Sequence, residues 1–212
     1  MPVEGRDYII TIFLRTHHLY SGTGEMMGTK LERIAEISTN TRRPEFTSLY
    51  HHINAEMLKQ CHKELDGNKA VGIDRVTKAK YEVNLEENIS NLVKRLKNKS
   101  YKPLPSLRVF IPKGNGKMRP LGIASYEDKM VQLAVKKILE AIYEPRFLGN
   151  MHGFRPRRGC HDAIKEVYNR MYSGKINYIV DADIKGFFDH MNHEWIMKFW
   201  GIHKRPEPLM VD

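Results

Sequence analysis

Cysteine is scarce in this sequence and does not occur in a metal-binding pattern. The 212 residues include only Cys61 and Cys160, which are far apart and have no CxxC spacing. Disulfide frameworks and zinc sites need more cysteines, or more closely spaced ones. The sequence therefore argues against both, and a reducing cytoplasm is the expected location.

Long apolar runs are also lacking. None approaches the roughly 20 residues that a transmembrane helix needs. The apolar stretch at residues 8–14 is short, and no small-residue cleavage site clearly follows it. We therefore expect neither a signal peptide nor a membrane partner.

Acidic residues are too few to balance the basic ones, and the imbalance is local. The chain has 35 Lys and Arg against 25 Asp and Glu, a net charge of +10. Residues 99–158 alone contain 13 Lys or Arg and four Asp or Glu, a net of +9. A concentrated basic segment suits nucleic acid or a nucleoside triphosphate. The alternative is a solvated basic surface that keeps the protein in solution.

Apolar residues recur at the helical period in several stretches, and the length allows one large or two small domains. A helix from Asn84 would place basic residues in its last turn, where the helix dipole favours them. The loop Gly67-Asn-Lys-Ala-Val-Gly-Ile-Asp74 precedes it, and Asp74 is expected to cap a turn. Residues 1–45 are expected to be a loosely packed extension. Helices are predicted over residues 30–37, 46–65, 84–99 and 127–143, and from His161 to residue 172.

A basic β-hairpin is predicted in the middle of the positive segment. Residues 107–111 and 118–123 alternate as strands around the turn Gly114-Asn-Gly116. Lysine and arginine near the tip would let the hairpin close over a triphosphate. Alternatively, they protect an exposed strand edge. The basic residues at or near the predicted tip are Arg108, Lys113, Lys117 and Arg119.

Two further segments contain candidate functional residues. The loop Gly153-Phe-Arg-Pro-Arg-Arg-Gly159 combines arginines with an aromatic ring, which suits contacts to single-stranded nucleic acid. In Tyr178-Ile-Val-Asp-Ala-Asp-Ile-Lys-Gly-Phe-Phe-Asp189, a strand is predicted to begin at residues 178–181 and to end at Asp183. A carboxylate there would suit Mg²⁺, or it would cap a following helix. Another helix is predicted from His193.

Together these segments resemble the reverse transcriptases encoded by bacterial group II introns. The resemblance covers about residues 46–200, and its motifs follow the family's order and spacing. They are Arg108-Val-Phe-Ile-Pro-Lys113, Gly116-Lys-Met-Arg-Pro-Leu-Gly-Ile123, Tyr126-Glu-Asp-Lys-Met-Val-Gln132, Ile142-Tyr-Glu-Pro145, Gly153-Phe-Arg-Pro-Arg-Arg158 with His161, and Asp181-Ala-Asp-Ile-Lys-Gly-Phe-Phe-Asp189 with His193.

The resemblance implies an α+β, right-hand polymerase fold, with an extension at residues 1–45, fingers at 46–172 and a partial palm at 173–212. It implies two-metal nucleotidyl transfer with Mg²⁺, and RNA, dNTP and a DNA primer as partners. Asp183 and the backbone of Ile184 would meet the metal, and Lys113 and Arg119 the triphosphate. Phe188, or its neighbour Phe187, would lie under the sugar. The implied nucleic-acid contacts are Arg108, Lys117, Arg155, Arg157 and Arg158.

The sequence also departs from the family pattern. Arg75 stands where the family has glycine, and the Tyr-x-Asp-Asp motif that supplies the other metal-binding carboxylate does not occur. Asp181 and Asp189 are the only acidic neighbours of Asp183. We therefore expect a truncated family member that binds RNA, does not polymerise, and self-associates through an open palm edge. The alternative is a non-enzymatic, maturase-like RNA-binding splicing factor.

Overall fold

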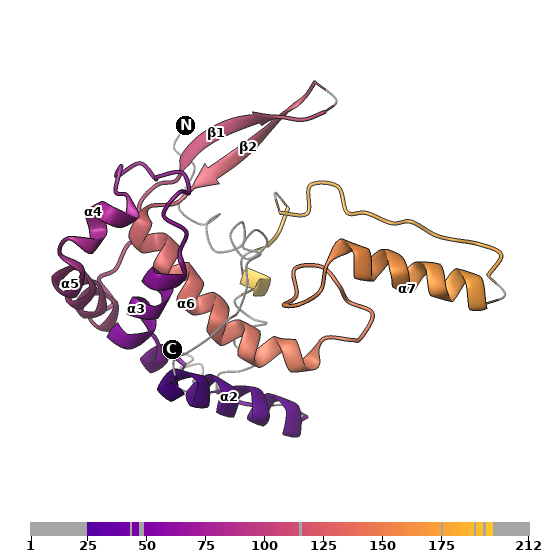
Figure 1. Cartoon of the computed structure of the whole chain (residues 1–212), viewed down its shortest axis with the longest axis horizontal. Helices are drawn as coiled ribbons and strands as arrows, with labels where there is room; N and C mark the ends of the chain where they lie inside the picture. Colours follow the sequence, from indigo (N-terminus) through magenta and orange to yellow (C-terminus); the bar gives the residue numbers. More distant parts are fainter. Residues whose placement is uncertain are drawn as a thin grey trace, which may run out of the picture.

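The computed structural model describes residues 25–42, 44–46, 49–114, 116–174, 176–188, 190–192 and 194–196, with side chains from Lys30 onward. Helices and one two-stranded antiparallel sheet make up this part, which confirms a mixed α and β fold (Figure 1). No helix within these ranges is both long and apolar enough to cross a bilayer. The elements are α2 (Glu25–Asn40), η1 (Tyr50–His52), α3 (Ala55–Glu64), α4 (Lys78–Glu82), α5 (Leu85–Lys97), β1 (Leu107–Pro112), β2 (Met118–Ile123), α6 (Tyr126–Tyr143), η2 (Glu144–Arg146) and α7 (Cys160–Ser173).

Polar caps determine where the helices begin. The Asn54 side chain accepts a hydrogen bond from the backbone N–H of Met57 at 3.0 Å, so α3 begins at Ala55. The prediction of one helix over residues 46–65 was therefore wrong in its first part, because Asn54 is extended and separates η1 from α3. Ser125 caps α6 in the same way.

The core lies where α2 and α3 pack on α6 and where α5 packs on α3 (Figure 1). Ile34 of α2 is buried in this core, and the Ser38 hydroxyl donates to the carbonyl of Ile142 at 2.5 Å. The expectation of a loose N-terminal extension was thus wrong for α2, because one face of this helix is apolar and packs on α6. The fully buried residues include Met57, Leu58, Cys61, Ile89, Leu92, Met130 and Ile142.

The loop between α3 and α4 packs closely against the start of α6. A Cβ on Gly72 would lie 2.6 Å from the carbonyl oxygen of Ala124, so only glycine fits this approach. Two residues later, the Asp74 carboxylate accepts from the backbone N–H of Val76 at 3.3 Å, which confirms its predicted capping role.

The predicted hairpin forms and projects from the helical body (Figure 1). Its register pairs Leu107 with Ile123 at the base and Pro112 with Met118 near the turn. Gly116 takes the left-handed conformation that this turn requires, with φ of 75°. All of β1 is exposed, so the hairpin contributes little to the core.

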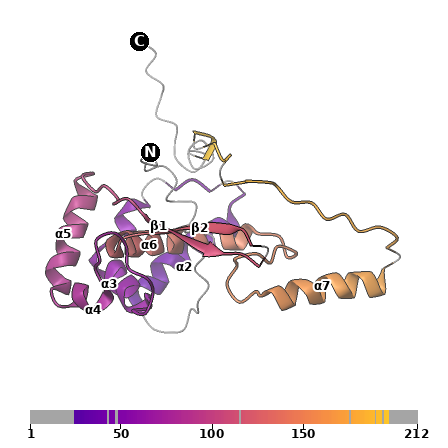
Figure 2. The same cartoon turned by 90° about the horizontal axis from the view of Figure 1, so that it is seen from above.

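The region after η2 lies beside this body and has few buried residues. Helix α7 buries none of its residues, and an extended segment runs back from its end (Figures 1 and 2). The prediction of a strand beginning at residues 178–181 was wrong, because residues 176–184 form no ladder. A strand needs a neighbouring strand to accept and donate its backbone hydrogen bonds, and within the described ranges only β1 and β2 pair. The helix predicted from His193 falls largely on residues outside the description.

Candidate nucleic-acid interface

The four basic side chains of the hairpin differ in the face to which they point and in their distance from the turn. Residues directly opposite each other share a face, and successive residues alternate. Arg119 pairs with Ile111, whereas Arg108 pairs with Gly122, so the two arginines point to opposite faces. Arg108 also lies near the base of the hairpin, and its predicted place near the tip was wrong. Lys113 and Lys117 flank the turn, joined by a backbone hydrogen bond of 2.7 Å.

Residues 99–126 contain no Asp or Glu, but they contain six Lys or Arg. This acid-free segment comprises the connector that follows α5 and the whole hairpin. Its basic residues are all exposed. Elsewhere in the positive window several basic residues have acidic partners: Lys136 with Glu140, Lys137 with Glu64, and Arg155 with Glu144. The hairpin and the connector before it thus carry exposed basic residues with no acidic residue among them.

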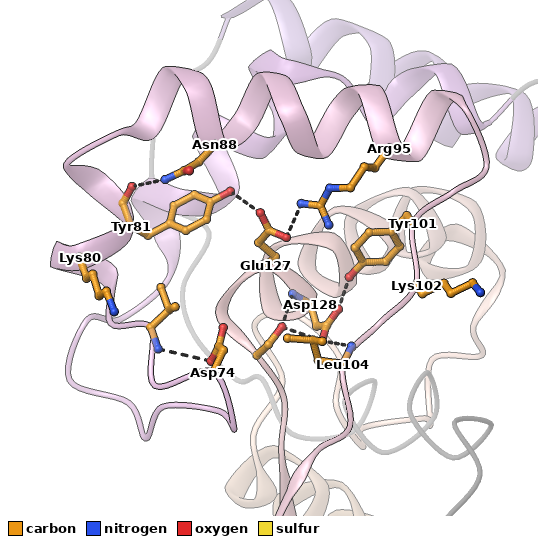
Figure 3. Close-up of a pocket in the computed structure, with 12 residues that line it drawn as sticks. Asp74, Lys80, Tyr81, Asn88, Arg95, Tyr101, Lys102, Leu104, Glu127 and Asp128 are labelled. Carbon is orange, nitrogen blue, oxygen red and sulfur yellow. Dashed lines mark hydrogen bonds and ion pairs between the residues drawn. The ribbon is translucent and has the colours of Figure 1, made fainter.

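A pocket of about 400 Å³ lies beside the base of the hairpin, between α4, α5 and α6 (Figure 3). Asp128 is buried in its wall and accepts hydrogen bonds from the Ser125 hydroxyl at 2.6 Å, the Leu104 backbone N–H at 3.1 Å and the Tyr101 hydroxyl. Burial and the bond to Asp128 raise the pKa of Tyr101. This carboxylate holds the connector 101–104 against the first turn of α6.

The neighbouring carboxylate, Glu127, makes a second set of contacts in the same pocket. It accepts from Arg95 at 2.5 Å and from the Tyr81 hydroxyl at 3.2 Å (Figure 3). The bond to Glu127 raises the pKa of the Arg95 guanidinium, and burial raises that of Tyr81. Neither periodicity nor motif spacing predicted this network. Its signal was the pair of acids that follows Ser125 at the start of a helix.

His62 is buried on α3, between the Tyr126 hydroxyl and Glu82. Its Nδ1 lies 2.9 Å from the Tyr126 hydroxyl, while Nε2 lies 4.0 Å from Glu82. Burial lowers the His62 pKa, nearby Lys78 lowers it further, and Glu82 opposes them. A histidine whose pKa in the folded chain lies below its unfolded value, near 6.5, binds a proton more weakly in the folded chain. Protonation below that pH therefore favours unfolding.

We therefore expect the free energy of unfolding to fall as the pH drops through about 6.5 and below, because the unfolded chain then binds the proton more readily. Urea unfolding at pH 7.5 and 5.5 measures this change. Replacing His62 by glutamine should reduce the difference in unfolding free energy between the two pH values, whereas the same change at exposed His161 should leave it as in the wild type. An equal pH response in all three proteins would contradict the role of His62.

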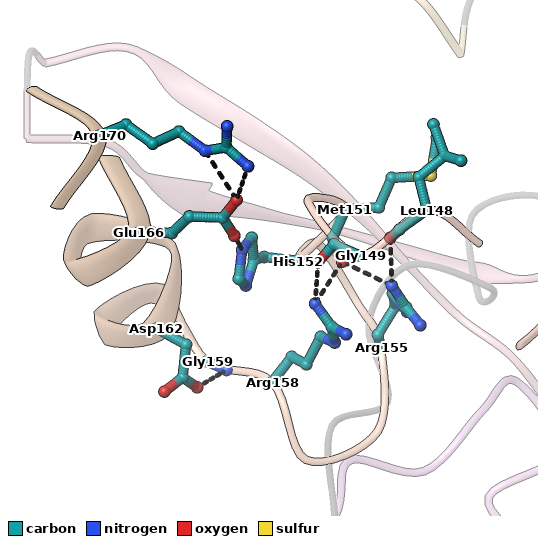
Figure 4. Close-up of polar contacts among 10 residues, drawn as sticks. All are labelled: Leu148, Gly149, Met151, His152, Arg155, Arg158, Gly159, Asp162, Glu166 and Arg170. Carbon is teal, nitrogen blue, oxygen red and sulfur yellow. Dashed lines mark hydrogen bonds and ion pairs between the residues drawn. The ribbon is translucent and has the colours of Figure 1, made fainter. Parts of the chain in front are cut away.

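The arginine-rich loop is held together from within by Arg155, which is only 7% exposed. Its guanidinium donates to the Glu144 carboxylate at 2.9 and 3.0 Å, and to the carbonyls of Leu148 at 2.8 Å and Met151 at 2.9 Å (Figure 4 shows the carbonyl contacts). It also lies over the Phe147 ring, 5.3 Å from the centroid. These bonds occupy four of the five guanidinium N–H groups. In this structure Arg155 shapes the loop, and its contact with nucleic acid stays a prediction.

The other two arginines of the loop differ from Arg155 and from each other. Arg158 is half-buried and donates to the carbonyls of Gly149 and Met151 (Figure 4). Arg157 is exposed, and its backbone is left-handed with φ of 57°. Arg155 and Arg158 thus bond to nearby backbone carbonyls, whereas Arg157 faces solvent.

Asp183 and Asp181 lie exposed on the extended segment after α7, and Asp189 lies outside the description. No group of three or more His, Cys, Asp or Glu that could hold a metal ion occurs in the described part of the chain. The carboxylates in the described part therefore do not converge on a site that could hold two dications. Ile184, Phe187 and Phe188 are also largely exposed, and their assigned roles stay predictions.

The chain is similar in sequence to reverse transcriptases and to group II intron-encoded proteins. The reverse transcriptase (RNA-dependent DNA polymerase) family model matches residues 111–211, so this part of the chain has the sequence of a reverse transcriptase domain. The group II intron-encoded protein LtrA of Lactococcus lactis subsp. cremoris is 38% identical over 165 residues, which is 77% of this chain and 27% of that protein. The chain belongs to the family of group II intron-encoded reverse transcriptases and maturases.

Other similar proteins include intron-encoded ones. Protein YkfC of Escherichia coli K12 is 36% identical over 135 residues, 62% of this chain and 35% of that protein. The putative COX1/OXI3 intron 1 protein of Saccharomyces cerevisiae is 36% identical over 110 residues, 52% of this chain and 13% of that protein. The chain spans about a quarter to a third of the length of the bacterial relatives.

Proposed function

We propose that this chain binds RNA through its acid-free basic segment, residues 99–126, and does not itself polymerise. The observation that carries the proposal is that this segment has six basic residues, all of them exposed, and no acidic one, and that four of the six lie on the projecting hairpin. Phosphate oxygens are the natural partners of such a surface, because lysine and arginine replace the counterions of the backbone. The RNA would be a template or intron RNA, as family membership suggests.

In this proposal residues 46–172 correspond to the fingers and 173–212 to part of the palm of a right-hand polymerase. Lys113 and Arg119 would meet a dNTP triphosphate, with Phe188 or Phe187 under the sugar. In a complete site Asp183 and the Ile184 backbone would hold Mg²⁺ beside a DNA primer. The lack of an acid cluster around Asp183 in the described residues supports RNA binding without catalysis, as in a maturase-like splicing factor.

Self-association is part of the same proposal. Tyr178 and Val180 are each 89% exposed on the extended segment after α7. Unpaired backbone and exposed apolar side chains together favour pairing with another strand. Sedimentation of the purified chain at several concentrations tests this expectation, and a monomer throughout would contradict it.

RNA affinity and polymerisation can be tested separately. We expect single-stranded RNA to bind with a log affinity that falls linearly with log salt, and Asp183→Ala to leave this affinity unchanged. Primer extension with Mg²⁺ and all four dNTPs should give no product from the 212-residue chain, while an active reverse transcriptase extends the primer under the same conditions. If the wild-type chain made product and Asp183→Ala did not, the proposal that the chain does not polymerise would be wrong. If RNA did not bind in a salt-dependent way, the proposal of RNA binding would be wrong.

A further inference from the structure

The arginine-rich loop encloses a hollow of about 320 Å³ whose lining is both apolar and polar. Phe147, Met151, His152, Gly153 and Arg155 surround it. Phe147 and Met151 are 43% and 46% exposed, so an apolar surface faces solvent there. Arg155 covers one side of the Phe147 ring and is fixed by its bonds to Glu144 and to the loop carbonyls. The hollow is therefore a preformed feature with a rigid, partly aromatic wall.

His152, which lines this hollow, has one ring nitrogen in an ion pair and one without a hydrogen-bond partner in the described part of the chain. Its Nε2 lies 2.6 Å from the carboxylate of Glu166, which also accepts from Arg170 of the next helical turn (Figure 4). Its Nδ1 is buried and has no hydrogen-bond partner among the described residues. Because Nε2 faces a carboxylate, Nε2 carries the proton, and in the neutral ring Nδ1 is an acceptor.

The residues next to the hollow are held in an unusual backbone conformation. Phe154 and Arg157 have φ values of 58° and 57°, in the left-handed region that residues other than glycine seldom occupy. Both side chains are exposed, and Phe154 directly follows Gly153 of the hollow. Arg155 and Arg158 bond to the loop carbonyls and hold this conformation. Such strain persists where the fold maintains it, and it often marks a binding surface.

From these features we infer that the hollow receives one unpaired nucleobase of the bound RNA. An aromatic and thioether wall suits the flat face of a base. The exposed Arg157 would neutralise an adjacent phosphate. This inference rests on the proposed RNA binding and adds that the loop selects single-stranded over fully paired RNA. A base in a duplex remains stacked and does not enter a side pocket.

A bulky side chain at the wall of the hollow tests the inference. A Cβ at Gly153 would meet no atom within 4 Å, so Gly153→Leu adds a side chain in open space at the wall of the hollow. A Cβ at Gly149, four residues earlier, would also meet no atom within 4 Å, and Gly149 does not line the hollow. Gly149→Leu is therefore the matched control. The probes are a fluorescently labelled single-stranded oligoadenylate and a blunt RNA duplex of equal length. Thermal unfolding of both variants checks that the fold is retained.

We expect Gly153→Leu to weaken binding of oligoadenylate by about tenfold, the effect of losing one stacked base, and to leave duplex binding unchanged. Gly149→Leu should bind both probes like the wild type. Unchanged oligoadenylate binding by Gly153→Leu, or equal losses for both probes, would overturn the base site alone. Failure of the wild-type chain to bind either probe would instead overturn the proposed RNA binding.

A second measurement does not depend on the variant. A single 2-aminopurine in the oligoadenylate reports the environment of one base, and acrylamide quenches its emission when the base is exposed. Moving the 2-aminopurine through successive positions should reveal one that the wild-type chain protects from acrylamide. If every position remains as accessible as in free RNA, the hollow does not hold a base.

Discussion

Replacing Asp128 by alanine is expected to destabilise the folded chain by on the order of 3–5 kcal/mol. The buried carboxylate accepts bonds from the Ser125 hydroxyl, the Leu104 backbone and the Tyr101 hydroxyl. Its removal leaves three donors without their partner, and each unsatisfied buried donor costs about 1–3 kcal/mol, with incomplete additivity. Because small domains are stable by only about 5–15 kcal/mol, this loss would bring the chain close to unfolding.

Urea unfolding followed by circular dichroism measures this effect, and two variants give its scale. Tyr101→Phe removes one donor and should cost about 1–2 kcal/mol. Glu87→Ala removes an exposed acid from the first turn of α5 and should change stability by no more than about 0.5 kcal/mol. If Asp128→Ala were as mild as Glu87→Ala, the connector would not depend on this carboxylate.

Neutralising the turn of the hairpin is expected to reduce RNA affinity by on the order of 10- to 100-fold. The triple variant Lys113→Ala, Lys117→Ala and Arg119→Ala removes half of the six positive charges of the acid-free segment. Each lost phosphate contact lowers the slope of log affinity against log salt by about 0.7 for single-stranded RNA. The slope should therefore fall by about 2, and stability should change little because all three residues are exposed.

A control with the same change of net charge separates local contacts from overall electrostatics. Arg33, Lys63 and Lys165 are exposed on α2, α3 and α7, away from the hairpin in sequence. Replacing these three by alanine should leave most of the RNA affinity and salt slope intact. If the two triple variants lost affinity equally, the chain would attract RNA by net charge alone. Filter binding or fluorescence anisotropy at several salt concentrations gives both quantities.

Local sequence signals predicted most of the elements around α6. The 3.6-residue period identified α5 and α6, and two alternating segments around Gly114-Asn-Gly116 identified the hairpin. These signals suffice because amphipathic helices and tight turns depend mainly on neighbours along the chain. The same reasoning placed a strand from residue 178, where the side chains are suitable. A strand also requires a partner, which local sequence does not supply.

The candidate interface was predictable in its charge but not in its geometry. The positive window was evident from composition, whereas the opposite orientation of Arg108 and Arg119 follows from the pairing register. Likewise, Arg155 and Arg157 look equivalent in sequence. One is buried against Glu144 and the other is exposed. Side-chain direction and burial depend on contacts between segments that are distant in the chain.

The sequence by itself determined the family, the helical and hairpin segments and the location of the excess positive charge. These follow from the order of residues, because motifs, periodicity and charge counts are properties of the chain itself. The tertiary structure alone decided which charges are compensated internally, how Asp128 joins the connector to α6, and that Gly153 lines a hollow beside the unsatisfied Nδ1 of His152. The physical reason is that ion pairs, buried hydrogen bonds and cavities arise only when folding brings separate segments together.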